Sequence, residues 1–191
     1  MKFQNARSEG INMKKKLLVV VDMQNDFIDG ALGTQEARAL APKLAERIGK
    51  FDGIVLATQD THGENYINTL EGKNLPVPHC IKGTIGWRIN KDIEDALLKQ
   101  GNGMVHTIEK PTFGSFKLID CVADVLKDID EIEVCGLCTG ICVLSNACLL
   151  RAAFPDTPIT VNAEYTECIT PTAKKHALAA LQLIQINVVG Q

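Results

Sequence analysis

Apolar and polar positions follow two alternating patterns along the chain. Short apolar runs rich in β-branched residues are separated by longer segments in which apolar residues recur every three or four positions. The runs predict six strands, at residues 16–21, 53–58, 103–108, 131–137, 159–162 and 185–189. The segments between them predict helices at residues 35–49, 91–100, 116–127, 141–153 and 170–183.

A strand and helix in alternation is typical of a parallel sheet covered by helices on both faces. We therefore predict one α/β domain, a three-layer α/β/α fold with a mostly parallel six-stranded sheet, over residues 13–191. Residues 1–12 are polar and aperiodic, which predicts a flexible leader that the domain can lose. Residues 60–88 predict neither helix nor strand, and loops of that length in a compact domain usually serve function.

Composition narrows the classes of partner. The formal net charge of −3 provides no broad basic surface, so the chain is not expected to bind nucleic acid or an anionic membrane. The apolar run at 17–21 is too short to span a bilayer or to act as a secretory signal. Seven cysteines without such a signal are expected to be reduced thiols, which favours a cytoplasmic protein.

Chemically active residues come directly after four of the predicted strands. The runs LLVVV, GIVLATQ, GMVHTIE and EIEVCGL lead into Asp22, Asp60, Lys110 and the turn that carries Cys142. In open parallel sheets ligands bind beyond the carboxyl ends of the strands, so these groups are expected to meet at one edge.

Each residue alone has an ordinary structural explanation. Asp22 could cap a turn, Lys110 could be solvated, and Cys142 could be a small buried apolar residue. Together they provide what nucleophilic catalysis needs. A helix N-terminus and an ammonium group favour a thiolate, and a carboxylate can carry its proton. We therefore expect Cys142 to have a pKa below the ordinary value of about 8.5.

Five motifs occur in order along the chain: VVVDMQNDFIDGAL, TQDTH, LPVPHCIKGTIG, EKPTFGSF and GLCTGICV. In sequence and spacing they resemble the motifs of the isochorismatase-like cysteine hydrolases. This resemblance runs from about residue 16 to the C-terminus and is nearest to nicotinamidases and pyrazinamidases. It implies an amide hydrolase that acts on a small molecule, with nicotinamide as the leading substrate, and a homo-oligomer.

The resemblance also implies roles for the strand-end residues. Cys142 would be the nucleophile, Asp22 the general acid and base, and Lys110 the group that stabilises the thiolate and orients the carboxylate. A cis peptide bond between Leu137 and Cys138 is implied as well, with the backbone amides of Cys138 and Cys142 forming the oxyanion hole.

A divalent metal is implied by a further part of the resemblance. Nicotinamidases hold an ion with the pattern that Asp60, His62 and His79 match here, and Glu71 lies at the spacing of the remaining ligand. Weaker candidates for that position are Glu64 and Asn68. Carboxylate and imidazole donors suit zinc, manganese or iron, with zinc as the first expectation.

Two departures affect the expected substrate pocket. Nicotinamidases usually have Asp where this chain has Gly140, and an aromatic residue close before a Pro-Pro-His motif where this chain has the sequence LPVPH at residues 75–79. An aromatic wall for the substrate would then have to come from Phe27 or Trp87, although Trp87 could equally be a packing residue.

Two other function classes stay open at this point. One is an amidase of the same family that acts on a carbamoyl or ureido group without a metal. The other is a binding or regulatory protein that keeps the fold without turnover. An isochorismatase proper is not expected, because such enzymes lack the cysteine nucleophile.

Overall fold

A six-stranded, entirely parallel sheet forms the middle layer of the part of the chain that the computed structural model describes, residues 15–101, 107–125 and 129–191. The strands are β1 (Lys16–Val21), β2 (Ile54–Asp60), β3 (Thr107–Lys110), β4 (Glu131–Leu137), β5 (Ile159–Glu167) and β6 (Asn187–Val189). Their spatial order is β3-β2-β1-β4-β5-β6. The fold class predicted from the sequence is therefore confirmed.

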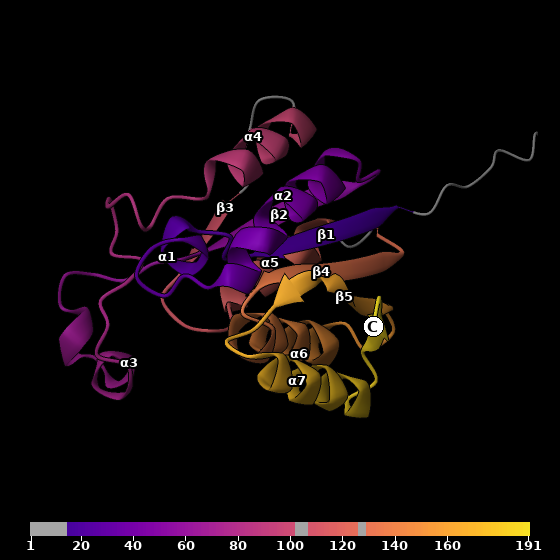
Figure 1. Cartoon of the computed structure of the whole chain (residues 1–191). Helices are drawn as coiled ribbons and strands as arrows, with labels where there is room; N and C mark the ends of the chain where they lie inside the picture. Colours follow the sequence, from indigo (N-terminus) through magenta and orange to yellow (C-terminus); the bar gives the residue numbers. More distant parts are fainter. Residues whose placement is uncertain (1–14, 102–106, 126–128) are drawn as a thin grey trace, which may run out of the picture.

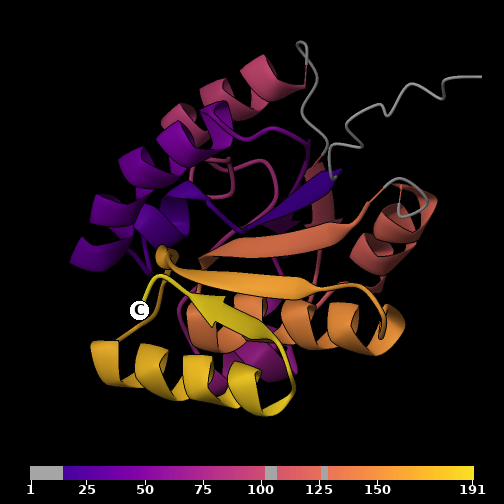
Figure 2. The same cartoon turned by 90° about the vertical axis from the view of Figure 1, so that its right-hand side faces the viewer.

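Helices cover both faces of this sheet, as Figure 2 shows. The helices are α1 (Asn25–Ile28), α2 (Gln35–Gly49), α3 (Leu70–Asn74), α4 (Lys91–Gln100), α5 (Phe116–Val125), α6 (Leu144–Ala153) and α7 (Pro171–Leu183). On one face α2 packs beside α4, and on the other α6 packs against α5 and α7. No helix within the described residues is long and apolar enough to cross a membrane.

The central strand β1 divides the core between the two faces. Leu18 and Val20 join the cluster with α2 and α4, whereas Leu17 and Val19 join the cluster with α5, α6 and α7. All four side chains are buried. Successive side chains of a strand point to opposite faces, so a strand with helices on both sides must be apolar at every position. The run LLVVV meets that requirement.

Several element boundaries differ from those predicted. The third strand continues to Lys110, and β5 continues to Glu167, five residues past its predicted end. The sixth strand begins at Asn187 rather than at residue 185. The expected leader, residues 1–12, and the predicted strand start at 103–106 lie outside the described residues. The extension to Lys110 places that lysine in the strand, where pairing with β2 fixes its backbone.

The prediction that residues 60–88 contain no helix is wrong. A 3-10 turn at Tyr66–Asn68 and helix α3 interrupt the loop. Thr69 links them, because its hydroxyl donates to the carbonyl of Tyr66 at 2.6 Å and accepts from the amide of Gly72 at 3.0 Å. Such short elements depend on local caps rather than on apolar periodicity, so the pattern could not reveal them. Figure 1 shows α3 and α1 at the same end of the sheet.

The helix predicted to start at residue 141 begins with a π-helical turn, Thr139–Val143, which runs directly into α6. In this turn the amide of Val143 donates to the carbonyl of Cys138, five residues back, at 3.2 Å. Single π turns inside helices are frequent at functional sites. Cys142 lies within this one.

Candidate active site

Three parallel strands, β3, β1 and β4, bring the predicted catalytic side chains together. Asp22 follows β1, Lys110 is the last residue of β3, and Cys142 lies in the turn after β4. Because parallel strands end at the same edge of the sheet, the three side chains converge although they are far apart in sequence. All three are buried, with at most 6% of any of them exposed.

The lysine contacts both other members of this group. Lys110 Nζ lies 2.7 Å from Asp22 Oδ2 and donates to Cys142 Sγ at 3.5 Å. The other carboxylate oxygen, Asp22 Oδ1, accepts a hydrogen bond from the Thr58 hydroxyl at 2.7 Å. The backbone of Asp22 lies in the left-handed region, with φ of 49°, a conformation unusual for a residue other than glycine.

The charges of this cluster depend on burial. Burial raises the pKa of the Asp22 carboxyl, against the opposing effect of the nearby Lys110 charge. Burial is the largest single influence on Lys110 and lowers its pKa, but attraction by Asp22, Cys142 and Asp60 together outweighs burial and raises that pKa. Lys110 is therefore a permanent cation, and Asp22 is a carboxylate whose affinity for a proton is increased.

The expected lowering of the Cys142 pKa is wrong for this structure. Burial raises the pKa of the thiol, the Asp22 charge raises it further, and the Lys110 charge opposes both. A hydrogen bond to the Asp22 carboxylate contributes to the same shift. The resting site therefore holds a thiol next to a carboxylate that can accept its proton, rather than a standing thiolate.

The turn that carries Cys142 also has the predicted backbone geometry. The peptide bond between Leu137 and Cys138 is cis. The carbonyl of Cys138 accepts from the amides of Ile141 at 3.0 Å and Val143 at 3.2 Å. Cys138 is thus held in the same turn as Cys142.

Four side chains of the 60–79 region form a second cluster beside the first. Asp60, His62, Glu71 and His79 each offer one ligand atom, and these atoms all lie within 4.8 Å of one another. His62 Nε2 is 2.9 Å from Asp60 Oδ2 and 3.6 Å from Glu71 Oε1, and His79 Nε2 is 3.7 Å from both of those oxygens. Ligands at about 2.1 Å around a tetrahedral ion lie about 3.4 Å apart, so this group fits a divalent metal.

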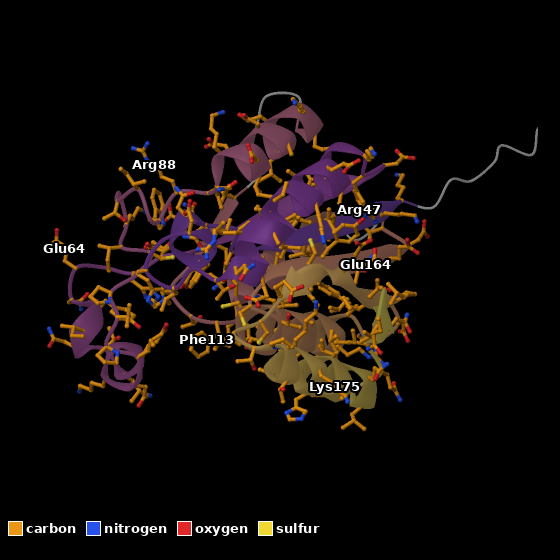
Figure 3. The ribbon with its side chains drawn as sticks, in the orientation of Figure 1. Arg47, Glu64, Arg88, Phe113, Glu164 and Lys175 are labelled. Atoms are coloured by element: carbon orange, nitrogen blue, oxygen red, sulfur yellow. The ribbon has the colours of Figure 1, made fainter. Side chains whose placement is uncertain are left out.

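Hydrogen bonds outside the cluster orient its members. His79 Nδ1 donates to the carbonyl of Val77 at 2.9 Å, which leaves Nε2 as the ring nitrogen with a free lone pair. The buried side chain of Gln24 accepts from the amide of Asp60 at 2.7 Å and donates to its carbonyl at 2.8 Å. The other candidate ligands, Glu64 and Asn68, are exposed, and Figure 3 shows Glu64 pointing away from the molecule.

Asp60 connects the two clusters. Its Oδ2 faces the imidazoles, and its Oδ1 accepts from Lys110 Nζ at 3.2 Å. Although burial alone would raise the pKa of Asp60, the hydrogen bond from His62 and the Lys110 charge lower it. The site thus forms one continuous polar network.

A cavity of about 250 Å³ lies beside the cysteine turn. Its walls are mostly apolar and consist of Phe27, Leu32, Thr34, Ala37, Leu75, Leu137, Cys138, Ile141, Glu167, Cys168 and Ile169. The Phe27 ring also lies 5.4 Å from the His79 ring, between centroids, so the cavity and the histidine cluster share this wall. A cavity of this size accommodates a small ring-shaped molecule.

Trp87, by contrast, is not among the described residues that line this cavity. Its indole Nε1 donates to the Thr61 hydroxyl at 2.9 Å, and its carbonyl accepts from the side chains of Gln24 and Gln59, both at 2.8 Å. Trp87 therefore holds the loop after β2, as its alternative role as a packing residue implies, and its contact with a substrate stays a prediction.

Sequence reasoning missed part of the cavity wall. Cys168 follows β5, and its Sγ lies 3.0 Å from Cys138 Sγ. A Cβ atom at Gly140 would lie 3.3 Å from Cys168 Sγ and 3.5 Å from Ala177 Cβ, so a side chain at position 140 would require Cys168 to move by a few tenths of an ångström. Cys168 comes directly after a parallel strand, which is where site residues are expected. It was missed because the strand was predicted to end at residue 162 rather than at Glu167.

Comparison with known proteins gives a consistent result. The family model described as the isochorismatase domain matches residues 16–190. An uncharacterized isochorismatase family protein, PncA of Bacillus subtilis (strain 168), is 34% identical over 146 residues, which are 70% of this chain and 76% of that protein.

One further relative and one solved structure carry the name of an activity. The nicotinamidase/pyrazinamidase of Mycobacterium tuberculosis is 28% identical over 146 residues, covering 69% of this chain and 76% of that protein. The crystal structure of nicotinamidase/pyrazinamidase PncA from Bacillus subtilis matches with a TM-score of 0.79 and 25% identity, over 92% of this chain and 99% of that one.

Proposed function

Because the chain belongs to the isochorismatase family over residues 16–190, we propose that it is a cysteine-dependent amide hydrolase that converts nicotinamide to nicotinate and ammonia. The observation that carries this proposal is the buried contact of Lys110 with both Asp22 and Cys142, at 2.7 and 3.5 Å. A thiol, a carboxylate and a cation in mutual contact are the groups that acyl transfer through a thioester requires.

The first half of the reaction forms the thioester. Asp22 takes the proton of Cys142 as the sulfur attacks the amide carbonyl, which explains how a thiol with a raised pKa can act as nucleophile. The backbone amides of Cys138 and Cys142 hold the oxygen that becomes negative. Asp22 then returns the proton to the nitrogen that leaves as ammonia.

The second half releases the acid. Asp22 accepts a proton from water, the hydroxide oxygen attacks the thioester carbonyl, and the same backbone amides hold the oxyanion again. The bond between carbon and sulfur breaks, and the thiolate regains its proton from Asp22. Throughout, the Lys110 cation stabilises the thiolate and fixes the direction of the Asp22 carboxylate.

Asp60, His62, Glu71 and His79 would hold a divalent ion, zinc by the chemistry of the donors, with manganese or iron as alternatives. Such an ion, when bound, supplies a Lewis-acidic contact for the ring nitrogen of nicotinamide. The Phe27 side chain stacks beside the ring, since it lines the cavity next to His79.

The test is ammonia release from a panel of amides, with and without a chelator. Nicotinamide should be hydrolysed, and Cys142→Ala should lose turnover with the fold intact. The matched control is Cys148→Ala, which removes an exposed thiol of α6 outside the site. Rapid quenching and mass spectrometry should find an acyl group on the Cys142 peptide of the wild type. Normal turnover by Cys142→Ala would refute the mechanism.

A second activity is favoured by one observation. The cavity wall carries Glu167 and the two thiols of Cys138 and Cys168, and it has Leu75 where nicotinamidases have an aromatic residue. Polar anchors of that kind suit a carbamoyl or ureido group. If chelator leaves turnover unchanged and a carbamoyl or ureido compound is the preferred substrate, this second activity replaces the first.

A further inference from the structure

A buried asparagine lies next to the nucleophile, and the mechanism above does not use it. Asn146 is in the first turn of α6, four residues after Cys142, and its side chain is entirely buried. A buried amide side chain must satisfy its donors and its acceptor, so its partners show which segments it holds together.

Those partners belong to the two segments that carry Cys142 and Lys110. The Nδ2 group of Asn146 donates to the carbonyl of Cys142 at 2.8 Å and to the carbonyl of Phe113 at 3.0 Å. Its Oδ1 accepts from the amide of Ser115 at 3.0 Å. Phe113 and Ser115 are in the loop that follows Lys110, and Figure 3 shows Phe113 at the end of the molecule where the strands finish.

The loop after Lys110 packs directly against α6, so the side chain of Asn146 can hydrogen-bond to both segments. A Cβ atom at Gly114 would lie 2.7 Å from Leu149 Cδ1 and 3.4 Å from Ser145 Cβ, so the glycine lets the loop lie directly on α6. Where this loop begins, the carbonyl of Lys110 accepts a hydrogen bond from the amide of Thr61, just after β2, at 2.8 Å. The backbone around Lys110 is thus fixed on one side by β2 and on the other by Asn146.

Asn146 therefore joins the Cys142 turn to the loop after Lys110 through three hydrogen bonds, and these two segments carry the two atoms, Cys142 Sγ and Lys110 Nζ, that lie 3.5 Å apart. We propose that Asn146 is a positioning residue, which sets the separation and direction of the nucleophile relative to Lys110. The kinetic test of this proposal rests on the proposed function, whereas a crystal structure of a variant tests it without any turnover.

The kinetic test compares Asn146→Ala with a matched control. Gln100→Ala also removes a side-chain amide that donates to two backbone carbonyls, those of Ile48 at 2.7 Å and Phe51 at 2.9 Å, but it joins α4 to α2 away from the site. Asn146→Ala should lower kcat on the order of 10- to 100-fold, the effect of displacing a reacting group by about 1 Å. Its KM should stay within about twofold, because Phe113 and Ser115 do not line the cavity and Cys142 bonds to Asn146 only through its backbone carbonyl. Gln100→Ala should keep both constants while losing a similar amount of thermal stability.

A conservative variant separates positioning from simple loss of stability. In Asn146→Thr the hydroxyl can still donate to the carbonyl four residues back, so the bond to Cys142 is retained while the bonds to the loop are lost. Its kcat should lie between those of the wild type and Asn146→Ala. If kcat in the two variants follows melting temperature alone, or if Gln100→Ala loses as much kcat, the positioning role is refuted.

A crystal structure of Asn146→Ala provides the test that does not require turnover. Cys142 Sγ should lie about 1 Å farther from Lys110 Nζ than in the wild type. An unchanged separation would overturn the proposal, even if the wild type proves to hydrolyse no amide at all. Conversely, absence of amide hydrolysis with the expected displacement would remove the proposed function and leave the positioning role of Asn146 in place.

Discussion

Replacing Lys110 by Met should destabilise the fold strongly, because the lysine is the cation between two buried carboxylates. Its Nζ lies 2.7 Å from Asp22 Oδ2 and 3.2 Å from Asp60 Oδ1, and 1% of the residue is exposed. Methionine has a similar length and leaves no large cavity, so the change tests charge compensation rather than packing.

The magnitude follows from these distances. With an effective dielectric constant of about 20, the two attractions amount to about 6 and 5 kcal/mol before the cost of desolvation. Breaking one buried pair typically lowers the free energy of unfolding by about 3–5 kcal/mol. For a chain of this size that corresponds to a melting temperature lower by about 6–20 °C.

The loss should grow as the pH rises. Without Lys110, the folded-state pKa of Asp22 rises further above the unfolded value of about 3.9. Folded protein then binds a proton that the unfolded chain releases, so stability falls with increasing pH between those two values. Thermal unfolding of Lys110→Met should therefore show a larger deficit at pH 8 than at pH 5.

The control is Lys16→Met, which removes a lysine whose ion pair with Glu131 has side chains 45% and 36% exposed. A surface pair of this kind contributes at most about 1 kcal/mol. If Lys110→Met melts within about 3 °C of Lys16→Met at pH 8, the view that Lys110 compensates buried charge is refuted.

Three further predictions concern the scaffold. Leu44→Ala in α2 removes a fully buried side chain and should lower the unfolding free energy in urea by about 2–5 kcal/mol, whereas a loss below about 1 kcal/mol would contradict the packing described. Thr170→Ala removes the cap that accepts from the amide of Ala173 and should reduce the melting temperature in line with about 1 kcal/mol, measured by calorimetry. Gly136→Ala should lower the urea midpoint of unfolding by the equivalent of at least about 3 kcal/mol. Gly136 has a φ of 108°, and a Cβ atom there would lie 2.2 Å from the carbonyl oxygen of Val21. An unchanged midpoint would show that the strand can shift to make room.

The edge of the sheet that carries the proposed catalytic residues could be predicted from sequence because one rule determines it. A residue directly after a buried strand of a parallel sheet lies at the carboxyl edge, whatever the details of the helices. The rule places Asp22 directly, and it places Lys110 at the end of β3 and the turn of Cys142 just beyond β4. The roles of the three residues came from the family resemblance. Glu71 was different, because its assignment came from spacing in a related family, and only the structure shows it within reach of both histidines.

Other features depend on contacts that no local pattern encodes. The pKa of Cys142 was expected to fall because of the helix and Lys110, but burial by the surrounding layers has the larger effect. The orientation of Trp87 depends on a hydroxyl from another segment, Thr61. The short elements between Tyr66 and Asn74 arise from a single cap at Thr69.

The residues of the site come from strands that are far apart in the sequence, and this has a consequence for folding. Lys110 is 50 residues from Asp60 and 32 residues from Cys142, so each contact closes a long loop of chain. Contacts so distant in sequence form late and slowly, after the strands between them have paired. A partly folded chain in which β4 has not yet joined β1, such as one still leaving the ribosome, therefore has Asp22 in place without Cys142 beside it. The cluster of Asp22, Lys110 and Cys142 is complete only when the central strands have paired.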